Sequence, residues 1–127
     1  MKYLLDTHTA VWIFENKMNL SVTAKRILDD VSVSLYVSII SAWEIAIKTS
    51  LGKMIFNGGS TLFIETIRRN EIGLIPLKPS YLACVETLPF LHRDPFDRLL
   101  VATAKTDGMT ILTADENIRH YDIPTAW

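Results

Sequence analysis

Residues 94–115 read DPFDRLLVATAKTDGMTILTAD, and this stretch predicts a capped helix followed by a short buried strand. Asp94 is a favourable cap, and Pro95 suits the first helical position because its missing N–H would have no partner there. Gly108 is typical of the residue that ends a helix. Residues 109–112, of which all but Thr110 are apolar, then predict a strand that runs into Thr-Ala-Asp. The stretch is therefore one helix-to-strand unit.

Similar units recur towards the amino terminus. Residues 3–5 are apolar and precede a helix-like segment, and the β-branched run 35–40 precedes a helix that Ser41 opens and Gly52 closes. Residues 74–77 predict an edge strand, because the proline within them cannot donate to a sheet ladder. Strands that alternate with helices of this length favour a parallel sheet covered on both faces. We therefore predict an α/β fold, a three-layer α/β/α sandwich with a central parallel sheet.

Three more helices are predicted between these units. They are a helix capped by Ser21 with Ala24, Ile27, Leu28 and Val31 along one face, a helix between Gly58 and Gly73 capped by Ser60, and a helix from Ser80 to about Leu88. Residues 119–127 either form a last strand or pack over the edge of the sheet.

Length and composition point to one domain spanning residues 1–127. The chain has 127 residues, is 49% hydrophobic and carries a formal charge of −1, so any nucleic-acid contact needs a local basic patch. Its single cysteine, Cys84, cannot form an intrachain disulfide, and Asp6 interrupts what would be a signal-peptide core. No apolar run is long enough to span a bilayer. We predict a cytoplasmic protein without membrane contact.

Four acidic residues are placed to converge on one end of the sheet: Asp6, Glu44, Asp97 and Asp115. Ligands of such sheets bind beyond the carboxyl ends of the strands. Two carboxylates about 4 Å apart repel by roughly 4 kcal/mol at an effective dielectric constant near 20, so a cluster needs a compensating cation. Oxygen ligands without a Cys or His cluster suit Mg²⁺ or Mn²⁺, which favours hydrolysis of a phosphodiester.

Each acid also has a purely structural interpretation. Asp6 could cap the helix that follows it, Ser41 and Glu44 fit a capping box, and Asp97 and Asp115 could stabilise helix starts. For each acid alone, capping and function both stay open, and their joint placement favours function. Asp94 is explained by capping, with a supporting role near the acids as the alternative.

Several motifs resemble the PIN-domain ribonucleases, specifically the VapC-like toxins of bacterial toxin–antitoxin pairs. The matching motifs are LDTHT (5–9), SAWEIAIK (41–48) with LGK (51–53), HRDPFDR (92–98) and LTAD (112–115), and the resemblance covers essentially the whole chain. It implies a PIN-type fold, Mg²⁺- or Mn²⁺-dependent endoribonuclease activity on RNA, homodimerisation and inhibition by a cognate antitoxin. Carried over by position, it implies that Asp6, Glu44, Asp97 and Asp115 are the catalytic metal ligands, and that Thr113 supports the last acid.

Other residues near the acids have two interpretations each. Lys48, Arg93 and Arg98 could contact RNA phosphates or could be solvated or ion-paired. For His8 and His92 we favour surface or structural placement over a catalytic role, since a metal-bound water needs no histidine base. For Trp12, Trp43 and Phe96 we favour core packing over base stacking.

Two other classes of protein compete with the nuclease hypothesis. A receiver domain of a signalling system has a similar length and binds Mg²⁺, but residues 74–77 lead to Lys78 and Pro79 rather than to a phosphoacceptor aspartate. A non-catalytic binding module would not need the four acids. A PIN-domain nuclease that processes RNA without an antitoxin also stays open.

Overall fold

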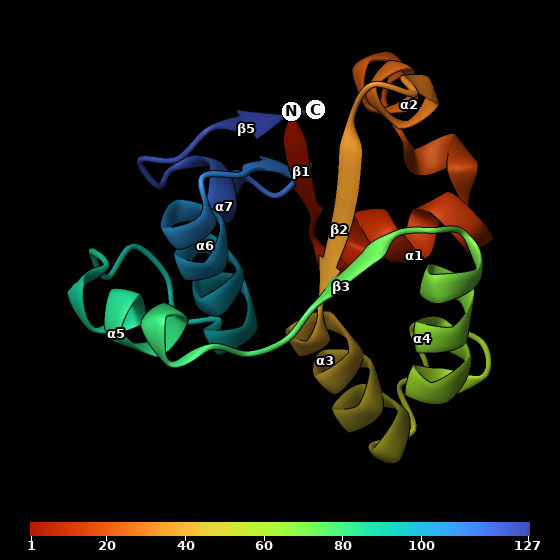
Figure 1. The fold of residues 1–127 in the computed structure, drawn as a ribbon. Coiled ribbons are helices and arrows are strands. Elements are labelled where there is room, and N and C mark those ends of the chain that lie inside the picture. The colour runs from red at the N-terminus through yellow and green to blue at the C-terminus, as the bar shows by residue number, and fades with distance from the viewer.

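The computed structural model describes residues 1–127 as alternating strands and helices (Figure 1). The strands are β1 (Lys2–Leu5), β2 (Ser34–Ser38), β3 (Gly73–Ile75), β4 (Thr110–Leu112) and β5 (Thr125–Ala126). The helices are α1 (Thr7–Glu15), the 3₁₀ turn η1 (Lys17–Asn19), α2 (Val22–Asp29), α3 (Ile39–Ser50), α4 (Gly59–Arg69), α5 (Pro79–Thr87), α6 (Pro95–Asp107) and α7 (Glu116–Arg119).

The five strands form one parallel sheet in the order β3-β2-β1-β4-β5. The chain builds outward from β1 to β3 on one side and then returns to place β4 and β5 on the other. The strand order therefore reverses between β1 and β4, which is where parallel α/β sheets bind ligands. The predicted edge position of the third strand is confirmed, with Pro76 just beyond its end, and residues 125–126 form a strand at the opposite edge.

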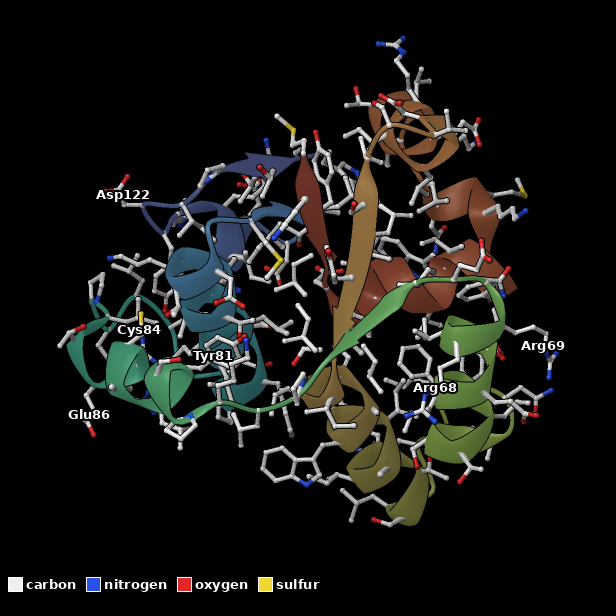
Figure 2. The ribbon with its side chains drawn as sticks, in the orientation of Figure 1. Arg68, Arg69, Tyr81, Cys84, Glu86 and Asp122 are labelled. Atoms are coloured by element: carbon white, nitrogen blue, oxygen red, sulfur yellow. The ribbon has the colours of Figure 1, made fainter.

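Two hydrophobic cores lie on the two faces of the sheet. Successive strand residues point to opposite faces, so Leu5 packs with α1 to α4 while Leu4 packs with α5 to α7. Figure 1 shows α1, α2 and α4 on one side of the strands and α5, α6 and α7 on the other, with α3 below the ends of β1 and β2. On the second face, Tyr81 reaches from α5 to α6, where its hydroxyl donates to Asp107 Oδ2 over 2.5 Å (Figure 2). The predicted three-layer α/β/α sandwich is confirmed.

The helix predicted from residues 94–115 forms with the expected ends. Asp94 Oδ1 accepts from the backbone N–H groups of Phe96 and Asp97, and Pro95 occupies the first turn of α6. Gly108 ends the helix with φ +66°, a left-handed conformation that glycine adopts without the steric cost of a Cβ.

Three predicted helix boundaries are wrong. α3 begins three residues earlier than predicted, because Ser38 rather than Ser41 caps it by accepting from Ile40 N–H at 3.0 Å. α4 is preceded by Gly58 in the left-handed conformation, not capped by Ser60. Val31 lies beyond the end of α2 and is fully exposed, so it does not belong to that helix's apolar face. No helix is both long and apolar enough to cross a membrane.

Candidate active site

Asp6 lies at the carboxyl end of β1 and is almost fully buried, with 4% of its surface exposed. It caps α1, because its Oδ1 accepts from Thr9 N–H at 2.8 Å, and its Oδ2 accepts from the Thr113 hydroxyl. Burial raises the pKa of Asp6 above its ordinary value, although the hydrogen bonds from Thr113 and Thr9 act in the opposite direction. The capping interpretation of Asp6 is thus correct, but the cap uses one oxygen and leaves the other directed towards β4.

Thr113 and Asp115 follow β4 and connect to Asp6. The Thr113 hydroxyl donates to Asp6 and accepts from Asp115 N–H at 2.9 Å, so one buried side chain links the two acids. Asp115 also caps α7 by accepting from Asn117 N–H at 2.9 Å. The β1–β4 pairing, which is parallel and in register, brings these residues together across 107 positions of sequence.

Glu44 lies in the second turn of α3 and is 4% exposed. Its Oε2 accepts from Lys48 Nζ at 2.6 Å, and its Oε1 is buried without a hydrogen-bond partner. The capping-box interpretation is wrong, because Ser38 caps this helix and Glu44 therefore lies beyond the first turn. A buried carboxylate oxygen without a hydrogen-bond partner lowers the stability of the fold. A cation bound to Glu44 Oε1 would remove this cost.

Asp97 shows that the acids converge. Its pKa is raised from 3.8 to about 8, first by burial and then by the charges of four other carboxylates, those of Asp94, Asp115, Glu44 and Asp6. Asp97 Oδ2 lies 3.3 Å from His92 Nε2. All four predicted acids and Asp94 therefore lie close enough together for their charges to interact.

These residues fit a divalent cation by their chemistry and charge. The donors are carboxylate oxygens, one of them buried and unpaired, and the charges on neighbouring acids oppose ionisation of Asp97. No three of these side chains form a ready-made metal cage. In the structure Asp6 accepts from Thr113, Glu44 from Lys48 and Asp115 from Asn117 N–H. Oxygen donors with excess negative charge are the set that Mg²⁺ and Mn²⁺ prefer.

The structure assigns the neighbouring basic residues to different roles. Arg93 is exposed, and Lys48 forms its ion pair with Glu44 while a third of its side chain stays exposed. Arg98, by contrast, is 7% exposed, and its guanidinium donates to Pro89 O at 2.9 Å and to the Tyr121 hydroxyl at 3.0 Å. This burial speaks against the interpretation of Arg98 as an RNA contact and equally against a solvated or ion-paired side chain. Arg98 anchors the segment before α6 instead.

The aromatic residues also divide. The core packing favoured for Trp43 is wrong, because this residue is 54% exposed and contacts Phe96 with ring centroids 5.2 Å apart. Phe96 and Trp12 are partly buried and pack against the two cores. Trp12 and His8, together with Asp6, Ala114 and Asp115, line a cavity of about 260 Å³ at the acids.

Tyr121, His92 and Arg98 form a hydrogen-bonded group that the sequence did not predict. The Tyr121 hydroxyl lies 2.9 Å from His92 Nδ1 and accepts from Arg98, which ties the residue that contacts Asp97 to the carboxyl-terminal segment. The structural placement favoured for His92 is correct. Only its position five residues before Asp97 hinted at the contact, and nothing in the spacing indicated Tyr121.

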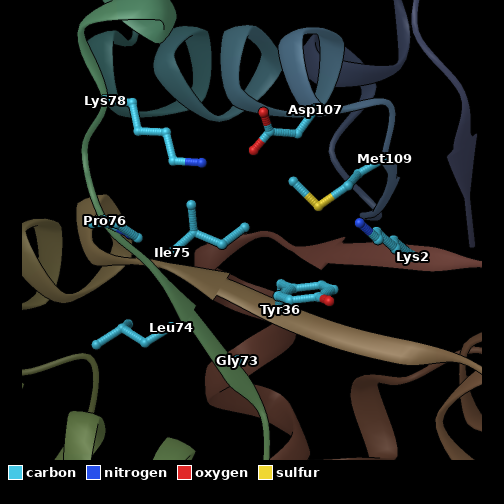
Figure 3. Close-up of a pocket in the computed structure, with 9 residues that line it drawn as sticks. All are labelled: Lys2, Tyr36, Gly73, Leu74, Ile75, Pro76, Lys78, Asp107 and Met109. Carbon is cyan, nitrogen blue, oxygen red and sulfur yellow. The ribbon is translucent and has the colours of Figure 1, made fainter.

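Two other charged surfaces lie away from the acids. A cavity of about 400 Å³ opens between β3 and the end of α6, with Lys2, Lys78 and Asp107 around it (Figure 3). Lys2 starts β1, whereas Asp6 follows its opposite end, so this cavity is separate from the acidic site. Arg68 and Arg69 are exposed on α4, across the sheet from α6 (Figure 2).

The two arginines near Asp97 allow a matched test. Replacing buried Arg98 with Met is expected to lower the free energy of unfolding by about 2 kcal/mol, because Pro89 O and the Tyr121 hydroxyl lose charge-assisted hydrogen bonds. Replacing exposed Arg93 with Ala is expected to change stability by less than about 0.5 kcal/mol. Urea unfolding of both variants measures this difference. Equal stabilities would contradict the anchoring role of Arg98.

Fold and site together define a class: parallel α/β proteins with an acidic centre at the carboxyl edge of the sheet, beside the point where the strand order reverses. The PIN domain model matches residues 3–124 of the sequence. The chain therefore belongs to the PIN domain family.

Individual relatives agree with this assignment. Ribonuclease VapC22 of Mycobacterium tuberculosis is 27% identical over 128 residues, which cover 98% of this chain and 97% of the relative. Among solved structures, VapBC2 from Rickettsia felis, bound to a DNA fragment from its promoter, has a TM-score of 0.75 at 14% identity and covers 100% of this chain and 99% of its own. VapBC-1 from nontypeable Haemophilus influenzae has a TM-score of 0.68 at 16% identity, with coverage of 99% and 97%. These two structures share the fold.

Proposed function

We propose that this protein is a divalent-metal-dependent endoribonuclease and the toxin of a toxin–antitoxin pair. The observation that carries the proposal is the convergence of four carboxylates on Asp97, beside the unpaired oxygen of Glu44. Membership of the PIN family, a relative named as a ribonuclease and structural likeness to VapBC complexes support the same conclusion. The receiver-domain alternative has no such support.

In this proposal Asp6, Glu44, Asp97 and Asp115 hold Mg²⁺ or Mn²⁺. When bound, the cation supplies an activated water and stabilises the leaving oxygen of the phosphodiester. Three further residues position these acids or add to their charge. Thr113 orients Asp6 through its hydroxyl, Asp94 adds negative charge beside Asp97, and His92 contacts the Asp97 oxygen.

The basic residues at the rim have a separate part in the proposal. Lys48 pairs with Glu44 in the structure, and it would be free to contact an RNA phosphate if Glu44 held the cation instead. Exposed Arg93 is the second phosphate contact. This arrangement provides a local positive rim on a protein whose net charge is −1.

RNA cleavage by the purified protein tests the proposal directly. Cleavage with Mg²⁺ or Mn²⁺ that stops on addition of a chelator is expected, and sequencing of RNA ends after expression in cells will identify the cut bond. Growth arrest on expression, relieved by a partner encoded next to the gene, separates a toxin from an RNA-processing nuclease. A nuclease-free preparation that leaves total RNA intact would contradict the proposal.

Metal binding is expected to stabilise the fold. A ligand that binds only the folded state at about 100 times its Kd adds roughly 2.7 kcal/mol to the free energy of unfolding. Thermal melting with and without Mg²⁺ or Mn²⁺ should therefore show a clear rise in Tm that a chelator reverses. The rise should shrink in Glu44→Gln, which removes one ligand charge. An equal rise in wild type and variant would place the cation elsewhere.

We also propose a cytoplasmic homodimer that binds an antitoxin. An exposed apolar surface supports dimerisation, and its members are Trp43, Leu82, Phe90 and Leu91, with exposures of 54%, 48%, 73% and 50%. Three of these residues border a cavity of about 390 Å³. Leu82→Lys is expected to convert the dimer to a monomer in light scattering. A dimer that persists in this variant would place the interface on another surface.

A further inference from the structure

The cavity at the acids is lined partly by two aromatic residues, His8 and Trp12, which have no part in the metal proposal. We call these two residues the aromatic wall. The volume of the cavity is about 260 Å³, and its lining consists of Asp6, His8, Trp12, Ala114 and Asp115. Two of these residues are proposed metal ligands, and two are aromatic side chains from α1. The same cavity is thus lined by acids proposed to hold the catalytic metal and by aromatic side chains.

The aromatic wall follows from the start of α1. Asp6 caps this helix, which begins at Thr7. Residues 8 and 12 lie on one face of it because they are four positions apart. Their ring centroids are 5.9 Å apart, at an interplanar angle of 35°. Trp12 also contacts Trp127, with ring centroids 5.8 Å apart. Trp12 is partly buried, whereas His8 is exposed.

The charge of the lining residues and the size of the cavity indicate which part of an RNA could bind at the aromatic wall. A phosphate placed against Asp6 and Asp115 needs the cation between them, so it belongs at the metal. The indole of Trp12 offers no charge to a phosphate, but it matches the face of a base, which stacks on aromatic side chains whatever its identity. The cavity is also smaller than the ~300–1,000 Å³ pockets of drug-sized ligands, which suits one ring system.

We propose that Trp12 and His8 form a subsite for one unpaired nucleobase next to the scissile phosphate. The inference rests on the proposed ribonuclease function. It implies that the substrate at the cut position is single-stranded, because a base within a helix is stacked on its neighbours and cannot enter the cavity. The subsite positions the phosphate on the metal by holding the adjacent base.

A double-mutant cycle between protein and RNA tests this subsite. The RNA is a short strand around the bond identified by end sequencing, either intact or with an abasic residue beside the cut. Trp12→Leu keeps apolar volume against the core but removes the stacking surface, and it is expected to lower kcat/KM for intact RNA about 5- to 100-fold. The abasic strand should be cut poorly by wild type and no more poorly by the variant. Trp12→Phe should restore most of the loss.

Controls separate stacking from stability and from the function itself. Melting curves show whether Trp12→Leu is folded, and exposed His8→Ala provides a second variant that does not touch the core. His8→Ala should lose about 2- to 5-fold on intact RNA only, as for a weak exposed stack. His120→Ala, an exposed histidine outside the cavity, should match wild type.

Equal activity of folded Trp12→Leu and wild type on intact RNA would overturn the subsite while leaving the ribonuclease proposal intact. An equal further loss on the abasic strand would also overturn it, since the tryptophan would then act independently of the base. Retained cleavage with lost inhibition by the antitoxin would assign the cavity to that partner instead. Absence of cleavage by wild type itself would contradict the proposed function rather than the subsite.

Discussion

Asp6→Asn is expected to lower the rate of RNA cleavage by about 10³-fold, because a metal supplies several kcal/mol of transition-state stabilisation and each 1.36 kcal/mol is about tenfold in rate. The substitution removes one negative charge from the proposed ligand set and changes the shape of the side chain very little. Cleavage of a defined RNA at saturating Mg²⁺ or Mn²⁺ measures the loss.

The variant should fold, which makes the activity loss interpretable. Asparagine is as good a helix cap as aspartate, so the bond from Thr9 N–H to the side-chain oxygen can persist. Burial already opposes the charge of Asp6, and neutralisation removes that cost. Asp122→Asn, at an exposed position (Figure 2), is the matched control and should retain wild-type activity. Undiminished cleavage by Asp6→Asn would rule out Asp6 as a required ligand.

Asp97→Asn is expected to lower cleavage by about 10²-fold or more and, at the same time, to stabilise the metal-free protein. The reason for the second effect is the raised pKa of Asp97, about 8 in the folded protein against an ordinary 3.8. Above pH 8 the folded protein must carry this charge beside other carboxylates. The asparagine carries none. A gain of roughly 5 °C in Tm at pH 8 without metal is a reasonable scale for relief of about 1 kcal/mol.

The dependence on pH has a definite sign. Well below pH 3.8, Asp97 is protonated in both folded and unfolded chains, and its contribution to stability is fully present. As pH rises towards 8, the unfolded chain releases the proton while the folded protein keeps it, so the metal-free wild type loses stability across this window. Asp97→Asn should lack this component, and the Tm difference between the two proteins should grow from pH 4 to pH 8.

Melting curves across this pH range, with a chelator present, check the effect. Asp29→Asn, at the exposed end of α2, is the control and should follow the pH profile of wild type. Bound Mg²⁺ or Mn²⁺ favours the ionised carboxylate and should flatten the wild-type profile. A metal-free Asp97→Asn protein that is clearly less stable than wild type would show that Asp97 acts mainly at the start of α6.

The elements at the acidic edge were predictable because their signals are local. Asp94, Pro95 and Gly108 define the ends of α6 through backbone geometry and hydrogen bonds that involve only near neighbours. The short apolar runs before Asp6 and Asp115 predicted strands for the same reason. The start of α3 was misplaced because Ser38 and Ser41 are equally good caps in sequence, and the pairing of β2 with β1 and β3 decides where the strand ends.

An α/β chain with acids after successive strands follows from the amino-acid sequence alone, and so do the residue types that suit a hard divalent cation. Three features depend on the packing of distant elements: Arg98 is an internal anchor, Trp43 is exposed, and the side chains of His8 and Trp12 share a cavity with Asp6 and Asp115. The two sets differ because helix caps and apolar strand segments depend on residues only a few positions apart. Burial, pKa and cavity shape depend on which elements pack together, and in this protein the strand order that reverses between β1 and β4 sets that packing.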